Sequence, residues 1–212
     1  MQLSTIRSIE RQHPQPEFVR EAADVIQRGG AVGFPTRCLY GLGADALNSE
    51  AVNRIFELKQ RPSGNPILVL IDHTSQLQPL VKRIPALASD LIDHYWPGRI
   101  TLVFEAADML PVNLTAGSGK IGIRMPGHAV ARALVNAVKG PITGTSANLS
   151  GSPGCFRVND LEPQVARGLD LILDAGDLKG GAGSTVVDVS EDEMQILREG
   201  EISAQELFAL SG

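Results

Sequence analysis

The chain has 212 residues, of which 43% are hydrophobic and 20% charged, and its formal net charge is −5 at pH 7. This is the composition of a globular protein long enough to bury a core, and the net acidity argues against a protein that binds nucleic acid over its whole surface. Its two cysteines, Cys38 and Cys155, are too few and too far apart for a disulfide scaffold. No apolar run reaches the length of a signal-peptide core or a membrane span, so we expect a cytoplasmic protein without membrane contact.

The first half of the chain alternates between helical and strand patterns. Apolar residues that recur every three or four positions predict helices, whereas short continuous apolar runs predict buried strands. Gly29 and Gly30 end the first helix, and Pro97 and Gly98 end the third. In chain order we expect a helix over 17–30, a strand over 31–36, a helix over 49–59, a strand over 66–71, a helix over 86–98 and a strand over 100–106.

The second half continues this alternation and finishes with closely spaced strands. We expect a strand over 120–126, a helix over 128–140, a short strand over 141–147, a helix near 160–168, strands over 170–176, 184–190 and 194–200, and a helix over 203–210. Ser203 and Glu206 form a capping box at the start of the last helix. Without a long linker or repeat, the pattern predicts one α/β domain over 1–212, with a mixed sheet because the last strands lie too close for helical crossovers.

Three common kinds of catalytic site lack their sequence patterns. The segment AGSGK at 116–120 resembles a phosphate-binding P-loop, but Leu114 and Ile121 stand where that loop needs glycine and a hydroxyl residue. We therefore interpret it as a surface turn. In GTSAN, Ser146 is followed by Asn148 where a hydrolase elbow needs glycine. The four histidines show no helical pairing, so we expect no metal site built by the protein.

A pair of cations follows the second predicted helix. Lys59 and Arg61 flank one residue where the helix gives way to a loop, so both could turn toward one anion. A planar guanidinium and a mobile ammonium together suit a phosphate or carboxylate. Cations at a helix C-terminus also simply complement its dipole, and the spacing alone favours that interpretation.

Polar groups also follow the strand at 141–147. Ser146 and Asn148 fall on the same side of an extended chain and could face a ligand at the strand end. A turn closed by their own side chains is the simpler interpretation of these residues alone. Arg124 and Arg198 each stand just beyond apolar strand residues, where they are either solvated edge charges or two further cations near strand ends.

Taken together, several motifs resemble the YrdC-like family in order and spacing, over about 17–203. They are PTRCLYGLGADA, KQRPSGNPILVLI, YWPGRITLVF, IGIRMPGH, TSANLSGSP, DLILDAG, STVVDV and ILREGEIS. The resemblance implies an open twisted α/β sheet curved around a large electropositive cavity, in the single-domain form of the family. It also implies an L-threonylcarbamoyladenylate synthase, a nucleotidyltransferase that makes threonylcarbamoyl-AMP and pyrophosphate from L-threonine, bicarbonate and ATP. Mg²⁺ would accompany the ATP, and separate transferase proteins would move the product onto tRNA.

The resemblance assigns expected roles to individual residues. Catalysis would fall to Lys59 and Arg61, which with Ser146 would hold nucleotide phosphates. Thr36 and Tyr40 would line the threonine end of the cavity. Around the nucleotide and threonyl groups, the resemblance places Arg124, Asn148, Ser184, Thr185 and Arg198.

The chain departs from the family pattern in PTRCLYG. The family usually has an acidic residue where Arg37 stands and a threonine where Cys38 stands. Cys38 is thus a stand-in for threonine rather than a nucleophile, because this reaction needs no covalent intermediate. The alternatives are a paralogue that acts on another amino acid or carbamoyl substrate, a relative of the carbamoyl-adenylate domain of hydrogenase maturation, or a non-catalytic RNA-binding or ribosome-associated protein. RNA contact is the property that would mark the last of these.

Overall fold

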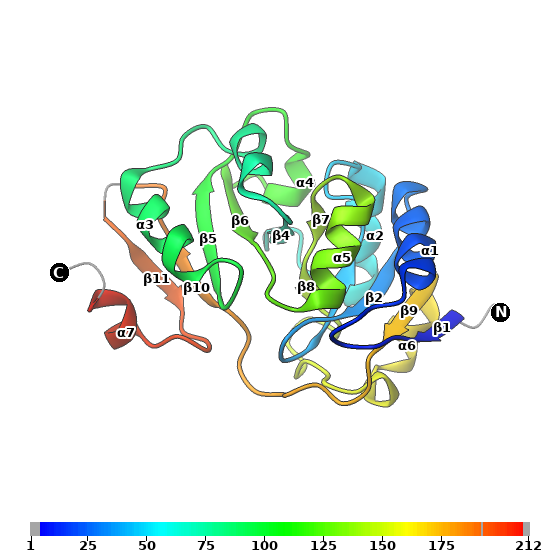
Figure 1. Cartoon of the computed structure of the whole chain (residues 1–212). Helices are drawn as coiled ribbons and strands as arrows, with labels where there is room; N and C mark the ends of the chain where they lie inside the picture. Colours follow the sequence, from blue (N-terminus) through cyan, green and yellow to red (C-terminus); the bar gives the residue numbers. More distant parts are fainter. Residues whose placement is uncertain (1–4, 192, 210–212) are drawn as a thin grey trace.

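The computed structural model describes residues 5–191 and 193–209, which form strands and helices in mixed order (Figure 1). In chain order these are β1 (Thr5–Ser8), α1 (Pro16–Gln27), β2 (Val32–Pro35), β3 (Tyr40–Gly43), α2 (Ser49–Lys59), β4 (Val69–Leu70), η1 (Thr74–Gln76), η2 (Gln78–Leu80), α3 (Ala86–Tyr95), β5 (Ile100–Glu105), α4 (Val112–Thr115), β6 (Lys120–Arg124), α5 (Ala129–Val138), β7 (Ile142–Thr143), β8 (Thr145–Ser146), η3 (Val158–Asp160), α6 (Pro163–Gly168), β9 (Leu171–Asp174), β10 (Thr185–Asp188), β11 (Gln195–Arg198) and α7 (Ala204–Phe208). No helix in this part of the chain has both the length and the apolar character needed to cross a membrane.

The strands form two mixed sheets. One has the order β1-β9-β2-β3-β8, and the other has the order β11-β10-β5-β6-β4-β7. In the first sheet β9 runs parallel to β1 and β2, while β3 is antiparallel to β2. In the second sheet β5 is parallel to β10 and antiparallel to β6, and β11 is antiparallel to β10. Both parallel and antiparallel pairs occur, as expected for a mixed sheet.

Helices cover each sheet on one side (Figure 1). Helices α1 and α5 lie beside β2 and β9, where Ile26, Leu134 and Val135 join a fully buried apolar cluster. Helix α3 lies beside β5 in the other sheet. Strand β5 alternates as a half-buried strand should: Ile100 and its alternate neighbours enter the core, whereas Thr101 faces the opposite side. That opposite side of the second sheet is the floor of the site.

Most of the predicted elements are confirmed within one or two residues at each end, but the strand predicted over 141–147 is divided in two. Its first part, β7, belongs to the six-stranded sheet, and its second part, β8, belongs to the five-stranded sheet. Gly144 stands between them, and a Cβ atom there would lie 2.6 Å from Leu70 Cγ. Only glycine lets the chain approach β4 this closely while it passes from one sheet to the other.

The strand predicted over 66–71 is shorter than expected, since only β4 belongs to a ladder. Pro66 has no N–H to donate, and the N–H of Ile67 donates to Leu114 O at 3.0 Å, outside the sheet. Strands β1 and β3 and the short helix α4 were not predicted. Strand β3 contains two glycines in four residues, which is a composition more typical of a turn than of a buried strand.

Candidate active site

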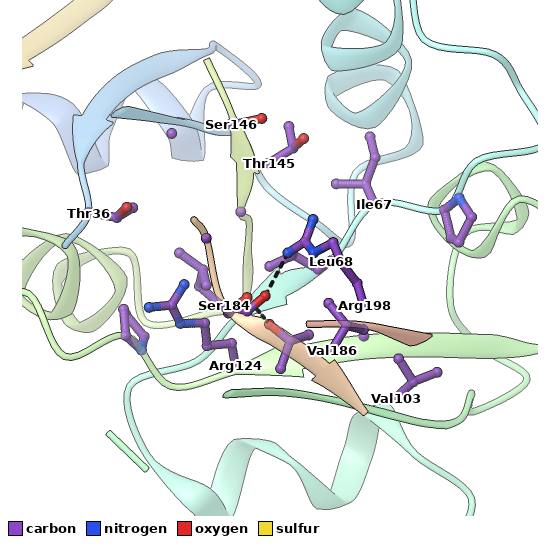
Figure 2. A pocket seen from close by; sticks show the side chains of 18 of the residues that line it. Thr36, Ile67, Leu68, Val103, Arg124, Thr145, Ser146, Ser184, Val186 and Arg198 are labelled. Carbon is purple, nitrogen blue, oxygen red and sulfur yellow. Dashed lines mark hydrogen bonds between the residues drawn. The ribbon is translucent and has the colours of Figure 1, made fainter. Parts of the chain in front are cut away.

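A cavity of about 500 Å³ lies where the two sheets face each other. Strands β5, β6, β10 and β11 form its floor, while the β2–β3 turn, strand β8 and the segment 61–68 form its walls. Figure 2 shows Thr36 and Arg124 at one side of the cavity and Ile67 and Val103 at the other. The site is thus polar at one side and apolar at the other.

Cationic side chains outnumber acidic ones on the cavity surface. Two carboxylates line it, Asp188 and Glu201. The cations that line it come from five separate places in the sequence: Arg37, Arg61, Lys120, Arg124 and Arg198. An acidic chain therefore carries a local positive site, which favours anionic ligands.

The end of α2 sends Lys59 and Arg61 in different directions. Gln60 has a left-handed backbone with φ 47, so the chain turns sharply between them. Arg61 lines the cavity, and its guanidinium donates to Asn65 O at 3.0 Å and to Pro66 O at 2.8 Å. Lys59 is 2% exposed and is not among the residues that line the cavity. Burial, together with the nearby Arg61, lowers the pKa of Lys59 to about 8.

Lys59 instead holds the loop that carries Ser146 and Asn148. Its Nζ donates to Ser146 O at 2.5 Å and to Asn148 O at 2.8 Å. The Asn148 amide donates to Leu149 O and Ser152 O, both at 2.7 Å, so it closes this loop on itself. Ser146 lines the cavity, whereas Asn148 is buried behind it. The predicted pairs therefore come together, with one member of each at the cavity.

Thr36 and Tyr40 belong to the turn between β2 and β3 and to its second strand. The Thr36 hydroxyl donates to Leu39 O at 2.6 Å, and the residue lines the cavity. Tyr40 also lines it, but its hydroxyl lies within 3.0 Å of Asp174 Oδ1 and donates to Gly176 O at 2.8 Å. Burial raises the pKa of Tyr40, so this hydroxyl keeps its proton. The Tyr40 hydroxyl ties β3 to the end of β9.

The other predicted residues lie on the floor or directly beneath it. Arg124 lines the cavity, donates to Gly98 O at 2.8 Å and has its pKa lowered to about 10 by burial, so it is cationic at neutral pH. Arg198 donates to Ser184 O at 2.8 Å, and Ser184 Oγ lies 2.7 Å from Thr101 Oγ1 (Figure 2). Thr185 is fully buried and absent from the cavity lining, because its hydroxyl binds Ile202 O at 2.6 Å.

The unusual pair in PTRCLYG meets an acidic residue from the far end of the chain. Arg37 Nε lies 3.2 Å from Glu201, which also takes Lys179 Nζ at 3.4 Å. Cys38 is 4% exposed, and burial followed by the charge of Glu201 raises the pKa of its thiol. A protonated thiol is a poor nucleophile. Glu201 thus neutralises Arg37.

Sequence reasoning missed a second ion pair on the floor. Lys120, at the end of the segment interpreted as a surface turn, lines the cavity, and its Nζ donates to Asp188 Oδ2 at 2.8 Å. Burial alone would raise the pKa of Asp188, but hydrogen bonds from Lys120 and Ser190 outweigh it and lower that pKa. The alternation in KIGIR was the available signal, since Lys120 and Arg124 share a strand face.

No group of three or more His, Cys, Asp or Glu side chains that could hold a metal ion occurs among residues 5–191 and 193–209. Both cysteines are unpaired by disulfides and buried. The chemistry this cavity offers is therefore binding of anions by cations and polar groups on two opposed sheets.

Comparison with known proteins identifies the family. The sequence profile of the Sua5/YciO/YrdC family, which carries the description "Telomere recombination", matches residues 24–200. The chain belongs to this family. It is 38% identical to the threonylcarbamoyl-AMP synthase of Pyrococcus abyssi over 92% of its length and 37% identical to that of Bacillus subtilis over 92%. It spans a little over half the length of these two relatives, 57% and 56%.

Solved structures of family members have the same fold. The crystal structure of P. abyssi Sua5 complexed with L-threonine is 36% identical, with a TM-score of 0.94 over 99% of this chain and 61% of that protein. The crystal structure of Escherichia coli YciO is 26% identical, with a TM-score of 0.87 over 97% of this chain and the whole of that protein. The expected YrdC-like α/β fold is thereby confirmed.

Proposed function

We propose that this protein is an L-threonylcarbamoyladenylate synthase, in class a nucleotidyltransferase. It joins L-threonine, bicarbonate and ATP into threonylcarbamoyl-AMP and releases pyrophosphate and water. One observation carries the proposal: five cations from both sides of a cavity converge in a chain whose relatives, aligned over nine tenths of it, are named threonylcarbamoyl-AMP synthase. That one relative was crystallised with L-threonine supports the amino acid chosen.

The chemistry explains why the cavity is cationic. The threonine amine first takes up the carboxyl group of bicarbonate to give a carbamate, and water leaves. A carbamate oxygen then attacks the α-phosphorus of ATP, and the bond to the β-phosphate oxygen breaks. Two anions must meet in this step, so fixed cations that offset their repulsion lower the barrier. Arg61, Arg124 and Arg198 are placed for this role, with Mg²⁺ supplied alongside the nucleotide.

Other predicted residues act by positioning. Lys59 and Asn148 hold the loop that presents Ser146, Tyr40 holds strand β3, and Thr185 fixes the turn after β11. We assign Thr36 to the threonine side of the cavity, next to Arg124 in Figure 2. The product, a reactive mixed anhydride, would pass to a transferase that modifies an adenosine of tRNA in the cytoplasm.

The test measures pyrophosphate release while each reactant is omitted in turn. We expect release only when threonine, bicarbonate and ATP are all present, and a drop of about 10²–10³-fold in turnover for Arg61→Ala. Arg7→Ala, which removes an exposed arginine paired with Glu21, is the matched control and should keep full turnover. Absence of turnover with threonine and other amino acids, combined with tight RNA binding at physiological salt, would instead favour the RNA-binding alternative.

A further inference from the structure

The floor of the cavity changes character along its strands. On β10, Ser184, Val186 and Asp188 face the cavity in turn, and on β6 the cavity-facing residues run from Arg124 to Lys120. Because Asp188 pairs with Val103 and Val103 pairs with Gly122, these positions form one row across three strands. The arginine end of the floor is thus separated from the Lys120–Asp188 end by a stretch of valine and glycine.

That middle stretch suits a flat apolar group. Val103 and Val186 contribute short side chains, and Gly122 contributes none. Ile67 and Leu197 also line the cavity, and Figure 2 shows Ile67 on the side of Val103, away from Thr36. A planar aromatic ring placed over this stretch buries both its faces against apolar atoms.

The Lys120–Asp188 pair is poorly suited to phosphates. The two side chains neutralise each other at 2.8 Å, and Asp188 also accepts from the Ser190 N–H at 2.9 Å and from the Ser190 hydroxyl at 2.6 Å. A triphosphate would gain little from a lysine already paired and would be repelled by the carboxylate beside it. A neutral ligand with one donor and one acceptor next to each other matches the pair.

We propose that Lys120 and Asp188 bind the Watson–Crick edge of the nucleotide base and select adenine over guanine. The inference rests on the proposed function only in taking ATP as the nucleotide. Adenine presents an amino donor at N6 and an acceptor at N1, so the carboxylate accepts from N6 and the ammonium donates to N1. Guanine presents an acceptor at O6 and a donor at N1, the reverse order, which leaves both charged groups facing like partners.

The test compares ATP with GTP as substrates. For the wild type we expect kcat/KM to favour ATP by at least about 100-fold, and for Lys120→Met and Asp188→Asn we expect that ratio to fall by at least about 10-fold. The asparagine keeps an oxygen for the Ser190 N–H and gains a donor that guanine O6 accepts. Lys82→Met is the matched control, because Lys82 is paired with Glu105 at 3.1 Å but does not line the cavity, and its ratio should equal that of the wild type.

Calorimetric binding of ATP and GTP without threonine separates this inference from the proposed function. If the wild type makes no threonylcarbamoyl-AMP yet binds ATP more tightly than GTP, and Lys120→Met abolishes the difference, the synthase proposal fails and the base-selecting role stands. Equal use and equal binding of both nucleotides by the wild type would overturn the role. So would an equal loss for ATP and GTP in Lys120→Met, which indicates phosphate contact, or a protein that binds neither nucleotide.

Discussion

At the scale of single residues, Gln60 separates two neighbouring cations into different tasks. Its left-handed backbone directs Lys59 into the protein and leaves Arg61 at the cavity. Lys59 has exchanged its water shell for the two carbonyls it binds, and burial lowers its pKa to about 8. The sequence spacing indicated a pair of cations but not their division, because the turn at Gln60 carries neither glycine nor asparagine, the residues typical of that conformation.

The lowered pKa of Lys59 makes stability depend on pH. Below pH 8 the lysine is charged in both the folded and the unfolded chain, and the burial cost is fully present. Between pH 8 and about 10.5 the folded chain releases this proton while the unfolded chain keeps it, so the free energy of unfolding rises with pH. Relative to Lys59→Met, the wild type should gain up to about 3 kcal/mol across this window, measured by urea unfolding. A constant difference between the two proteins would contradict this.

Cys38 offers a second prediction at this scale. Because burial raises the pKa of its thiol, Cys38→Ser should keep turnover within about threefold of the wild type. Iodoacetamide at pH 8 should label the folded protein far more slowly than the urea-unfolded protein, as followed by mass spectrometry. A collapse of turnover in a folded Cys38→Ser protein would reinstate the cysteine as a nucleophile.

At the scale of elements, the cavity depends on how β3 and β8 reach it. The ladder pairs Gly41 of β3 with Ser146 of β8, and the crossing at Gly144 brings β8 from the other sheet. Apolar runs and glycine signals were enough to predict most helices and the longer strands. They did not predict β3 or the division at Gly144, because both depend on contacts with residues distant in sequence, such as Leu70.

Tyr40→Phe tests the link between β3 and β9. The Tyr40 hydroxyl accepts the Ala175 N–H at 3.0 Å and donates to Gly176 O, so its removal leaves a buried N–H without that partner. We expect the free energy of unfolding to fall by about 1–3 kcal/mol. The KM for threonine should stay within about twofold, because the hydroxyl faces away from the cavity. A large rise in KM with unchanged stability would place the hydroxyl on the substrate instead.

At the scale of the whole molecule, an acidic chain concentrates positive charge between two sheets. Net charge could not predict this, because the five cations come from separate segments that only the fold assembles. Family motifs named seven residues that line the cavity, including Thr36, Ser146 and Arg198, and three that lie behind it, Lys59, Asn148 and Thr185. The motifs identify the loops correctly, but which side chain of a loop faces the ligand depends on local turns and burial.

The most direct measurement of the central claim supplies ¹³C-bicarbonate together with ATP and L-threonine and analyses the product by mass spectrometry. We expect an adenylate that contains one threonine and one labelled carbon, formed together with pyrophosphate. Its formation should stop when threonine is omitted and should be strongly reduced in Arg61→Ala. A folded protein that binds ATP in this cavity but forms no labelled adenylate, with threonine or any other amino acid, would contradict the proposed function.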